Sequence, residues 1–300
     1  MHQPGNMHIS VVIPTWRRTD QLIKTLTRIN ECTPPPAELL IHVDSGDTET
    51  ANIVRNRFPE VKIFESATRQ GPGGGRNILI RAAENEIVAS FDDDSYPIDK
   101  DYFSRLVSIF DNYPDASAVA SVIVHRNEPV PDATRKISTA TAFVNCGSAI
   151  CKQDFIETGG YVVLPLSYGM EETDLALRLM ASGKKIYFCP WLRTFHDTDL
   201  THHASPEINA AAIANIALLA FLRYPLVYLP YGVLQVLNRV IWCVKAGRFK
   251  GIFSGLTGIP CYLWRFKNTR SPIPVNIFHN VLRLMRKSIG KKQEPIVIKS

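Results

Sequence analysis

The chain has 300 residues, of which 45% are hydrophobic and 21% charged, values that exclude a disordered protein and allow a sizeable core. The net charge of +6 hides a division near residue 200. Residues 1–200 carry 20 basic and 26 acidic side chains, whereas residues 201–300 carry 14 and 2. This division favours catalysis in the first part and docking on an anionic surface in the second.

The first ninety residues alternate between predicted strands and helices. Apolar, β-favouring runs predict the strands, and apolar residues at helical spacing predict the helices. This order is typical of a parallel α/β sheet, in which the loops after the strands share one edge. The predicted strands are 8–13, 38–43, 61–64 and 87–91, and the predicted helices are 19–29, 49–57 and 78–84.

A glycine-rich segment, Arg69 to Asn77, follows the third predicted strand. Glycines allow backbone N–H groups to approach a phosphate, and the following helix start with Arg76 adds positive potential. A dinucleotide-binding loop would instead need G-x-G-x-x-G after the first strand. We therefore predict a phosphate-binding loop, with a plain flexible turn as the alternative.

Three adjacent acids, Asp92 to Asp94, end the apolar strand Ile87 to Phe91. Ligands bind at the carboxyl ends of the strands in an open α/β sheet. Hard oxygen ligands suit Mg²⁺ or Mn²⁺. Because alternate residues of an extended chain face opposite sides, we expect Asp92 and Asp94 to share one side and Asp93 to face the other. A solvated acidic turn before Pro97 is the alternative.

A second acidic segment begins a predicted helix at Glu171. Glu171, Asp174 and Arg178 share a helix face, and Asp174 is spaced to pair with Arg178. Glu172 points about 100° away from Glu171. A structural role at the helix start is the alternative for these acids. His196 follows the last predicted strand, where it can reach a metal. The other predicted elements here are helix 101–113 and strands 116–124, 144–150 and 185–190.

The six cysteines form no C-x-x-C pair, so we predict neither a zinc site nor a disulfide framework, but reduced cytosolic thiols. Met1 to His8 is polar and lacks a signal pattern, so nothing indicates export. The cysteines are Cys32, Cys146, Cys151, Cys189, Cys243 and Cys261.

From about His8 to His196, the order of these motifs resembles the inverting family 2 glycosyltransferases. The resemblance implies a GT-A fold, which is a Rossmann-like α/β architecture with a mixed, mostly parallel sheet flanked by helices. It also implies a single displacement at the sugar, with no covalent intermediate. The motifs are Pro14-Thr15 with Arg17-Arg18, Val43-Asp44-Ser45-Gly46, Gly71 to Asn77, Asp92-Asp93-Asp94, and Gly159-Gly160 before the acidic helix.

The resemblance further implies a role for each matching residue. Glu172 is expected to be the general base, although the family usually has Asp there, and Glu171 and Asp174 accompany it. The second strand ends Asp-Ser-Gly-Asp instead of Asp-Asp-Gly-Ser, which keeps Asp44 as the acid facing uracil or thymine. Metal binding falls to Asp92, Asp94 and His196, with Mg²⁺ or Mn²⁺ as cofactor. Nucleotide-sugar binding falls to Pro14, Thr15, Arg17, Asp44, Gly71, Arg76, Asn77, Asp92 and Asp93.

Residues 201–300 are predicted to form a helical, membrane-associated tail beside the catalytic domain of residues 1–200. The uncharged stretches Ile208 to Leu222 and Leu226 to Asn238 are short for a bilayer span of about 20 residues, so helices lying in the interface fit better. The basic end, Arg283 to Lys292, adds attraction to anionic lipid. A soluble helical subdomain or a dimer interface is the alternative. No nucleic-acid module is present, so nucleic acid is not an expected partner.

We therefore expect transfer of a sugar from a UDP- or dTDP-sugar to a glycan or lipid-linked acceptor, as in polysaccharide or cell-envelope synthesis. The expected location is cytoplasmic, peripheral on the inner face of the cell membrane. One alternative is a nucleotidyltransferase, which would release pyrophosphate. Another is a non-catalytic subunit that binds a sugar nucleotide or a glycan.

Overall fold

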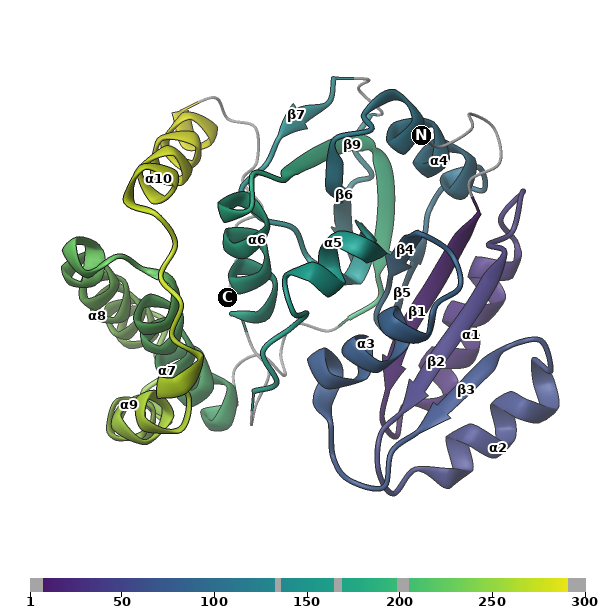
Figure 1. Cartoon of the computed structure of the whole chain (residues 1–300). Coiled ribbons are helices and arrows are strands. Elements are labelled where there is room, and N and C mark those ends of the chain that lie inside the picture. The colour runs from purple at the N-terminus through teal and green to yellow at the C-terminus, as the bar shows by residue number, and fades with distance from the viewer. Residues whose placement is uncertain (1–7, 133–135, 165–168, 199–204, 291–300) are drawn as a thin grey trace. The chain divides into compact units, whose positions relative to one another are not determined.

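The computed structural model describes residues 8–132, 136–164, 169–198 and 205–290 (Figure 1). They form two compact units. The N-terminal unit contains the described residues up to Val163 together with Gly183–Thr198. The C-terminal unit contains the described part of Leu164–Ser182 and the helices after residue 204. The acidic helix thus belongs with the C-terminal helices. Lys291 and Lys292 of the predicted basic end lie outside the described residues.

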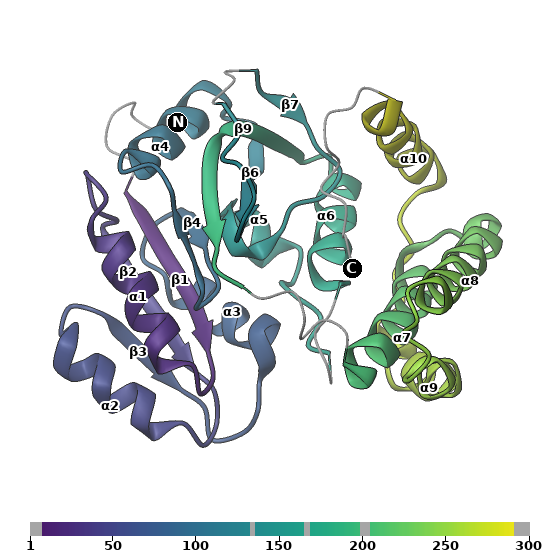
Figure 2. The same cartoon turned by 180° about the vertical axis from the view of Figure 1, so that it is seen from behind.

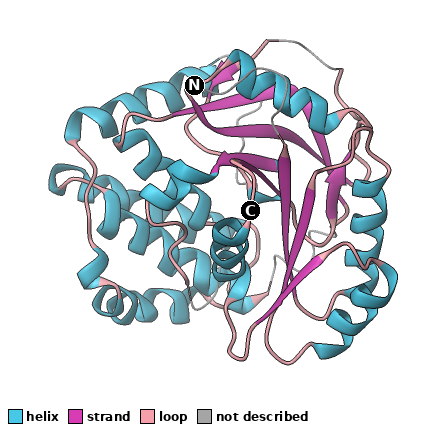
Figure 3. Cartoon of the chain, turned by 45° about the vertical axis from the view of Figure 1, so that its right-hand side comes forward, coloured by secondary structure: helices cyan, strands magenta, loops and turns pink. Residues whose placement is uncertain are grey.

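The N-terminal unit is built on one sheet of nine described strands, in the order β3-β2-β1-β4-β8-β6-β9-β5, with β7 paired to β9. Figure 3 shows the strands in magenta. The strands β1 to β4 are parallel, whereas β8 is antiparallel to both of its neighbours. This is the predicted mixed sheet. The strands are β1 (Ile9–Thr15), β2 (Glu38–Val43), β3 (Lys62–Glu65), β4 (Ile87–Ser90), β5 (Ser95–Pro97), β6 (Ala116–His125), β7 (Ser138–Thr139), β8 (Ser148–Cys151) and β9 (Lys185–His196).

Helices cover both faces of the sheet (Figures 1 and 2). Odd-numbered side chains of β1, such as Ile13, face the main apolar core, which α1, α2 and α4 complete. Alternate side chains of a strand face the other side, where α3 packs against β1 and β2 and also contacts α5. These helices are α1 (Thr19–Asn30), α2 (Thr48–Arg57), α3 (Gly71–Ala82), α4 (Tyr102–Asn112) and α5 (Lys152–Glu157).

The predicted glycine loop is wrong, because the glycines from Gly71 to Gly75 form the first turns of α3. Glycine disfavours a helix interior by about 1 kcal/mol, so a helix is not the expected outcome of the local sequence. Tertiary packing decides instead. A Cβ atom at Gly75 would lie 2.7 Å from Nδ1 of His42 and 3.2 Å from Cβ of Pro14. Only glycine lets α3 approach the sheet this closely.

The C-terminal unit is helical, and a buried ion pair joins two of its helices. Arg223, at the end of α7, donates from Nε to Oδ1 of Asp174 on α6 at 2.5 Å. Arg178 donates to Oδ2 of the same carboxylate from Nε and Nη2, at 2.9 and 2.6 Å. Asp174 is completely buried. The helices are α6 (Glu171–Ala181), α7 (Pro206–Arg223), α8 (Leu229–Lys245), α9 (Ile252–Arg265) and α10 (Val275–Gly290), with short 3₁₀ turns η3 (Leu226–Tyr228) and η4 (Lys267–Thr269).

Two segments of this unit are long and apolar enough to cross a membrane. The first, Pro206–Arg223, is 61% buried inside the protein, as a core helix of a soluble protein would be. The second, Leu226–Lys245, is only 22% buried. The described residues therefore leave much of the apolar surface of the second segment uncovered.

We expect Gly75→Ala to destabilise the protein. The added methyl group meets His42 and Pro14, and overpacking of this kind costs about 1–3 kcal/mol, more than the roughly 1 kcal/mol that alanine gains over glycine in a helix. Urea unfolding measures the change. The matched control is Gly258→Ala in α9, where a Cβ meets nothing within 4 Å, and there we expect no loss of stability. Equal effects of the two substitutions would contradict this account of α3.

We expect Asp174→Ala to cost about 3–5 kcal/mol, because it leaves the buried guanidinium of Arg223 without its carboxylate. The midpoint of urea unfolding measures the loss. The control is Glu207→Ala, which removes an exposed carboxylate from the first turn of α7 and should change stability by less than about 1 kcal/mol. A loss at Asp174 no larger than that at Glu207 would show that the ion pair does not hold α6 to α7.

Candidate active site

The three acids lie in a tight turn directly after β4. The turn is closed by the N–H of Ser95, which donates to the carbonyl oxygen of Asp92 at 3.1 Å. Ser95 then begins β5, which pairs with β9 so that Ser95 lies opposite His196. This pairing of strands distant in sequence brings the imidazole of His196 to Asp92 and Asp94.

The predicted metal ligands come together in this turn. Nε2 of His196 lies 3.1 Å from Oδ1 of Asp94 and 3.8 Å from Oδ2 of Asp92. Two ligands that each sit about 2.1 Å from one ion are separated by roughly 3–4 Å. His196 thus lies within reach of both predicted carboxylate ligands, and the assignment of these three residues to a metal stays a prediction.

Asp93 has partners of its own, and the predicted alternation of an extended chain does not apply because Asp93 and Asp94 lie in a turn. Its Oδ2 accepts a hydrogen bond from Oγ1 of Thr15 at 2.9 Å. Arg18 holds Oδ1 of Asp93 with Nη1 at 2.8 Å and Oδ2 of Asp94 with Nη2 at 2.6 Å. Arg18 is thus a member of the site that sequence reasoning did not select. It stands next to Arg17 in the same motif, and that adjacency was the available signal.

Arg76, on α3, contacts the acidic turn and is only 2% exposed. It pairs with Asp92, and its Nε donates to Oγ of Ser90 at 2.8 Å. Its Nη2 also donates to the carbonyl oxygen of Phe91 at 3.2 Å. Arg76 therefore fixes the end of β4, and its predicted role at a donor phosphate stays a prediction.

The charges in the turn shift each other's pKa. Burial alone would lower the pKa of His196, but Cys146, Asp94 and Asp92 outweigh it and raise that pKa to about 11. Burial alone would raise the pKa of Asp94, but the hydrogen bond and charge of His196, together with Arg18, hold it well below its usual range. For Asp93, burial and its acidic neighbours prevail over Arg18 and raise the pKa to about 7. The turn therefore favours positive charge at the position of Nε2.

Asp44 and Asn77 have structural partners on the same side of the sheet as α3. The carboxylate of Asp44 accepts backbone N–H bonds from Ser45, Gln70 and Gly71, at 2.8–2.9 Å, and so fixes the start of α3. Burial raises the pKa of Asp44, but these three bonds outweigh it and lower that pKa. The side-chain amide of Asn77 forms two hydrogen bonds with the backbone of Tyr161. Their predicted roles at the nucleotide stay predictions.

An exposed tryptophan with two arginines stands at the ends of β1 and β2. Trp16 is 40% exposed, and its Nε1 donates to the carbonyl oxygen of Ser45 at 3.1 Å. The guanidinium carbons of Arg17 and Arg69 lie 5.0 and 4.9 Å from the centroid of the indole. This set offers an aromatic face and two positive charges beside Pro14, Thr15 and Gly71. Trp16 and Arg69 were not among the predicted site residues.

The predicted catalytic acids lie on the first turn of α6 and have different surroundings. Asp174 is enclosed by Arg178 and Arg223 and so acts as a structural anchor. Glu171 is 5% exposed. Glu172 is the more accessible of the two glutamates, because its side chain is only partly buried. The three acids belong to the C-terminal unit, whereas the predicted metal ligands belong to the N-terminal unit.

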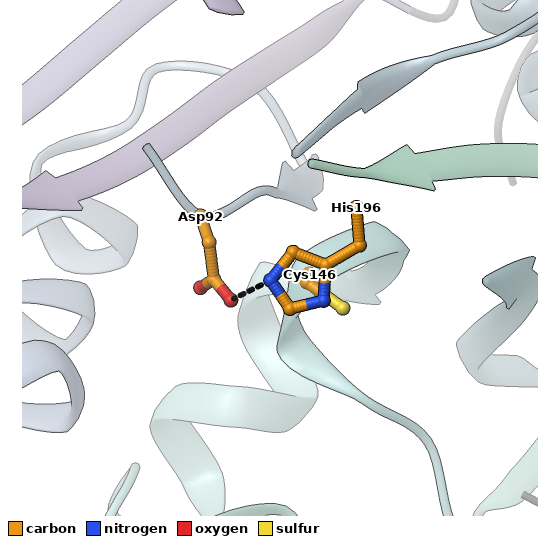
Figure 4. A group of neighbouring side chains, drawn as sticks. All are labelled: Asp92, Cys146 and His196. Carbon is orange, nitrogen blue, oxygen red and sulfur yellow. Dashed lines mark ion pairs between the residues drawn. The ribbon is translucent and has the colours of Figure 1, made fainter. Parts of the chain in front are cut away.

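Another residue that sequence reasoning missed is Cys146, in the 3₁₀ turn η1 (Asn145–Gly147). Figure 4 shows its side chain beside His196 and Asp92. The ligand atoms of these three residues lie within 4.8 Å of one another. A pairing between residues 50 positions apart leaves no local signal such as C-x-x-C.

Comparisons with known proteins agree with this fold. A sequence profile for glycosyl transferase family 2 matches residues 10–165, slightly more than half of the chain. No curated protein sequence matches the chain. Among solved structures, the mannosyltransferase PcManGT from Pyrobaculum calidifontis, in complex with GDP-Man and Mn²⁺, has a TM-score of 0.59 at 15% identity, and the match covers 96% of this chain and 83% of that one.

Two further structures are similar. S. aureus TarS 1–349 in complex with UDP-GlcNAc has a TM-score of 0.59 at 17% identity, with coverage of 93% and 85%. GalNAc-T7 with UDP, GalNAc and Mn²⁺ has a TM-score of 0.61 at 14% identity and covers 75% of this chain, which in turn spans about half (49%) of the GalNAc-T7 chain. At these identities the likeness shows the GT-A fold, and the profile shows the family. The chain belongs to glycosyl transferase family 2 and is a glycosyltransferase.

Proposed function

We propose that the protein is an inverting, metal-dependent glycosyltransferase that moves a sugar from a nucleoside diphosphate donor to a glycan or lipid-linked acceptor. The observation that carries this proposal is the convergence of Asp92, Asp94 and His196 at one edge of the sheet. Carboxylate oxygens suit Mg²⁺ or Mn²⁺, and His196 with Arg18 holds the pKa of Asp94 low, so that this carboxylate stays ionised. A bound divalent cation would supply positive charge for the diphosphate as it leaves.

The residues around the acidic turn support a nucleotide donor. Arg17 and Arg69 lie over the exposed indole of Trp16, and their positive charges suit the phosphates of a nucleotide. The similar structures contain UDP, GDP-Man or UDP-GlcNAc, and two of them also contain Mn²⁺. We propose a UDP- or dTDP-sugar as the donor, because Asp44 is predicted to face a uracil or thymine ring.

The reaction needs a base that removes the proton of the acceptor hydroxyl as its oxygen attacks the sugar. We assign this role to Glu172, whose carboxylate is more accessible than that of Glu171. Asp174 is a positioning residue, because both of its oxygens are held by arginines on α6 and α7. No covalent intermediate is formed, so the proton and the sugar move in one displacement.

We expect Glu172→Gln to lower the rate of sugar transfer by about 10²–10⁴-fold, because the amide cannot accept the proton. The measurement is release of nucleoside diphosphate from a panel of UDP-, dTDP- and GDP-sugars, with Mn²⁺, Mg²⁺ or EDTA, in the presence of membrane lipid and glycan acceptors. The matched control is Glu207→Gln, an exposed residue of α7 that should transfer sugar at the wild-type rate.

Each result of this experiment has a definite meaning. Release that is fast in wild type, slow in Glu172→Gln and lost in EDTA supports the proposal. Release that survives the substitution would reassign the base to Glu171, and release in EDTA would remove the metal from the reaction. Production of pyrophosphate from a nucleoside triphosphate would make the protein a nucleotidyltransferase.

We also propose that the C-terminal unit lies on the cytoplasmic face of the cell membrane. Large apolar side chains on η3, α8 and α9 are exposed, and they include Leu226 (73%), Val227 (70%) and Phe253 (80%). On α8 they recur at helical spacing, as on a helix that lies in a bilayer interface. The apolar face comprises Leu226, Val227, Val233, Leu234, Leu237, Ile241, Val244, Phe249, Phe253, Leu256 and Trp264.

Positive charge accompanies this apolar face. The sequence from Ile208 to Gln293 contains no Asp or Glu. Arg239 and Arg248 lie 4.5 and 4.9 Å from the ring centroid of Trp242, a combination found at headgroup depth in membranes. A cavity of about 480 Å³ on the same unit is lined by Tyr228, His279, Leu282, Arg283 and Arg286, and it suits an anionic headgroup.

We expect Phe253→Glu to reduce binding to anionic vesicles by tenfold or more. The substitution removes an apolar side chain whose burial in the membrane would contribute about 1.5–3 kcal/mol to binding. It also adds a negative charge, which anionic lipid repels. Flotation with phosphatidylglycerol vesicles measures binding, and phosphatidylcholine vesicles measure the part that does not depend on charge.

The matched control is Asn276→Glu, which makes the same change of charge at an exposed position of α10. It should lose only the electrostatic part of the affinity. Equal binding by the wild type and Phe253→Glu would exclude the apolar face as the docking surface.

A further inference from the structure

Cys146 is held beside the proposed metal ligands by close backbone packing. It is 2% exposed and lies in the 3₁₀ turn η1, directly before β8. The next residue, Gly147, leaves no room for a side chain, because a Cβ there would lie 2.5 Å from Oγ1 of Thr194 on β9. The turn therefore packs directly against β9, two residues before His196.

The thiol, the imidazole and a carboxylate converge from three separate segments (Figure 4). Asp92 follows β4, Cys146 precedes β8 and His196 ends β9, and their ligand atoms lie within 4.8 Å of one another. Ligands of one four-coordinate ion at about 2.0–2.3 Å lie roughly 3–4 Å apart. A movement of about 1 Å by these side chains brings all three within bonding distance of one ion.

The sulfur changes which metal this group prefers. Oxygen ligands suit Mg²⁺ and Mn²⁺, whereas thiolate ligands select Zn²⁺ and other thiophilic ions. One carboxylate, one imidazole and one thiolate are a zinc-type set of three protein ligands that leaves a fourth position open. A thiolate also needs no further partner once it binds the ion, which suits a side chain that is shielded from water.

We propose that Cys146 is a ligand of the metal site and that, through its sulfur, the site binds Zn²⁺ or Cd²⁺ in preference to Mn²⁺ or Mg²⁺. The inference rests on the proposed metal site of Asp92, Asp94 and His196. Cys146 adds a sulfur ligand to this site. The preference for Zn²⁺ or Cd²⁺ over Mn²⁺ or Mg²⁺ is then stronger than two carboxylates and an imidazole would give.

The test is metal binding by the full-length protein without donor or acceptor. Cd²⁺ titration followed by sulfur-to-metal charge-transfer absorption should show a band in the wild type and none in Cys146→Ser. Competition between Cd²⁺ and Mn²⁺ should show that Cys146→Ser lowers the preference for Cd²⁺ by at least about tenfold. The affinity for Mn²⁺ itself should change by less than that, because Mn²⁺ gains little from sulfur.

Two controls account for the other thiols. Cys189→Ser removes a buried thiol of β9 outside the group, and Cys261→Ser removes an exposed one. Both variants should keep the wild-type band and preference. A band that persists in Cys146→Ser, or that disappears in Cys261→Ser, would overturn the inference and leave Cys146 as a packing neighbour of His196.

One measurement needs no variant and so does not depend on whether Cys146→Ser folds. X-ray absorption on the wild type loaded with one equivalent of Zn²⁺ should show one sulfur at about 2.3 Å. A first shell of nitrogen and oxygen alone would overturn the inference. Neither measurement uses sugar transfer. A first shell without sulfur would therefore contradict the role of Cys146 and leave the proposed function unaffected. Zinc binding through sulfur without any sugar transfer would contradict only the proposed function.

Discussion

The N-terminal unit depends on the neutralisation of three carboxylates that lie in one short turn. At an effective dielectric constant of about 20, two like charges 4 Å apart repel by roughly 4 kcal/mol, and Asp93 and Asp94 are both buried. Arg18, Arg76 and His196 supply the compensating charge. These three residues come from the start of α1, from α3 and from the end of β9. The turn is therefore neutralised by residues from three elements that lie far apart in the sequence.

The close packing of α3 serves the same purpose. Because Gly75 brings the helix backbone against β1 and β2, the next residue, Arg76, reaches the end of β4 while remaining buried. Asp44 fixes the start of α3, because its carboxylate accepts hydrogen bonds from the first backbone N–H groups of the helix. The glycines and the acid that look like ligand-binding residues in the sequence are thus also the parts that set one helix at the correct height over the sheet.

Much of the fold could be predicted from the sequence because its signals are local. The strand Glu38–Val43 follows from its apolar, β-favouring run alone. The glycines of α3 could not be assigned correctly, since their effect depends on His42 and Pro14 in other segments. Cys146 was missed for a similar reason, because it was predicted to lie in a strand and its partner is 50 residues away. Arg223 was missed as well, because the sequence of an apolar helix does not indicate that its last residue pairs with Asp174, 49 residues earlier.

The ion pair between Asp174 and Arg223 has a consequence for how the protein is made. A ribosome releases α6 before α7, so for a period Asp174 has only Arg178, four residues away, as its counter-charge. The acidic helix acquires its second arginine only when residue 223 has emerged, by which time the sheet can already be complete. The acidic helix therefore acquires its second counter-charge only after β9, the last strand of the sheet, has been synthesised.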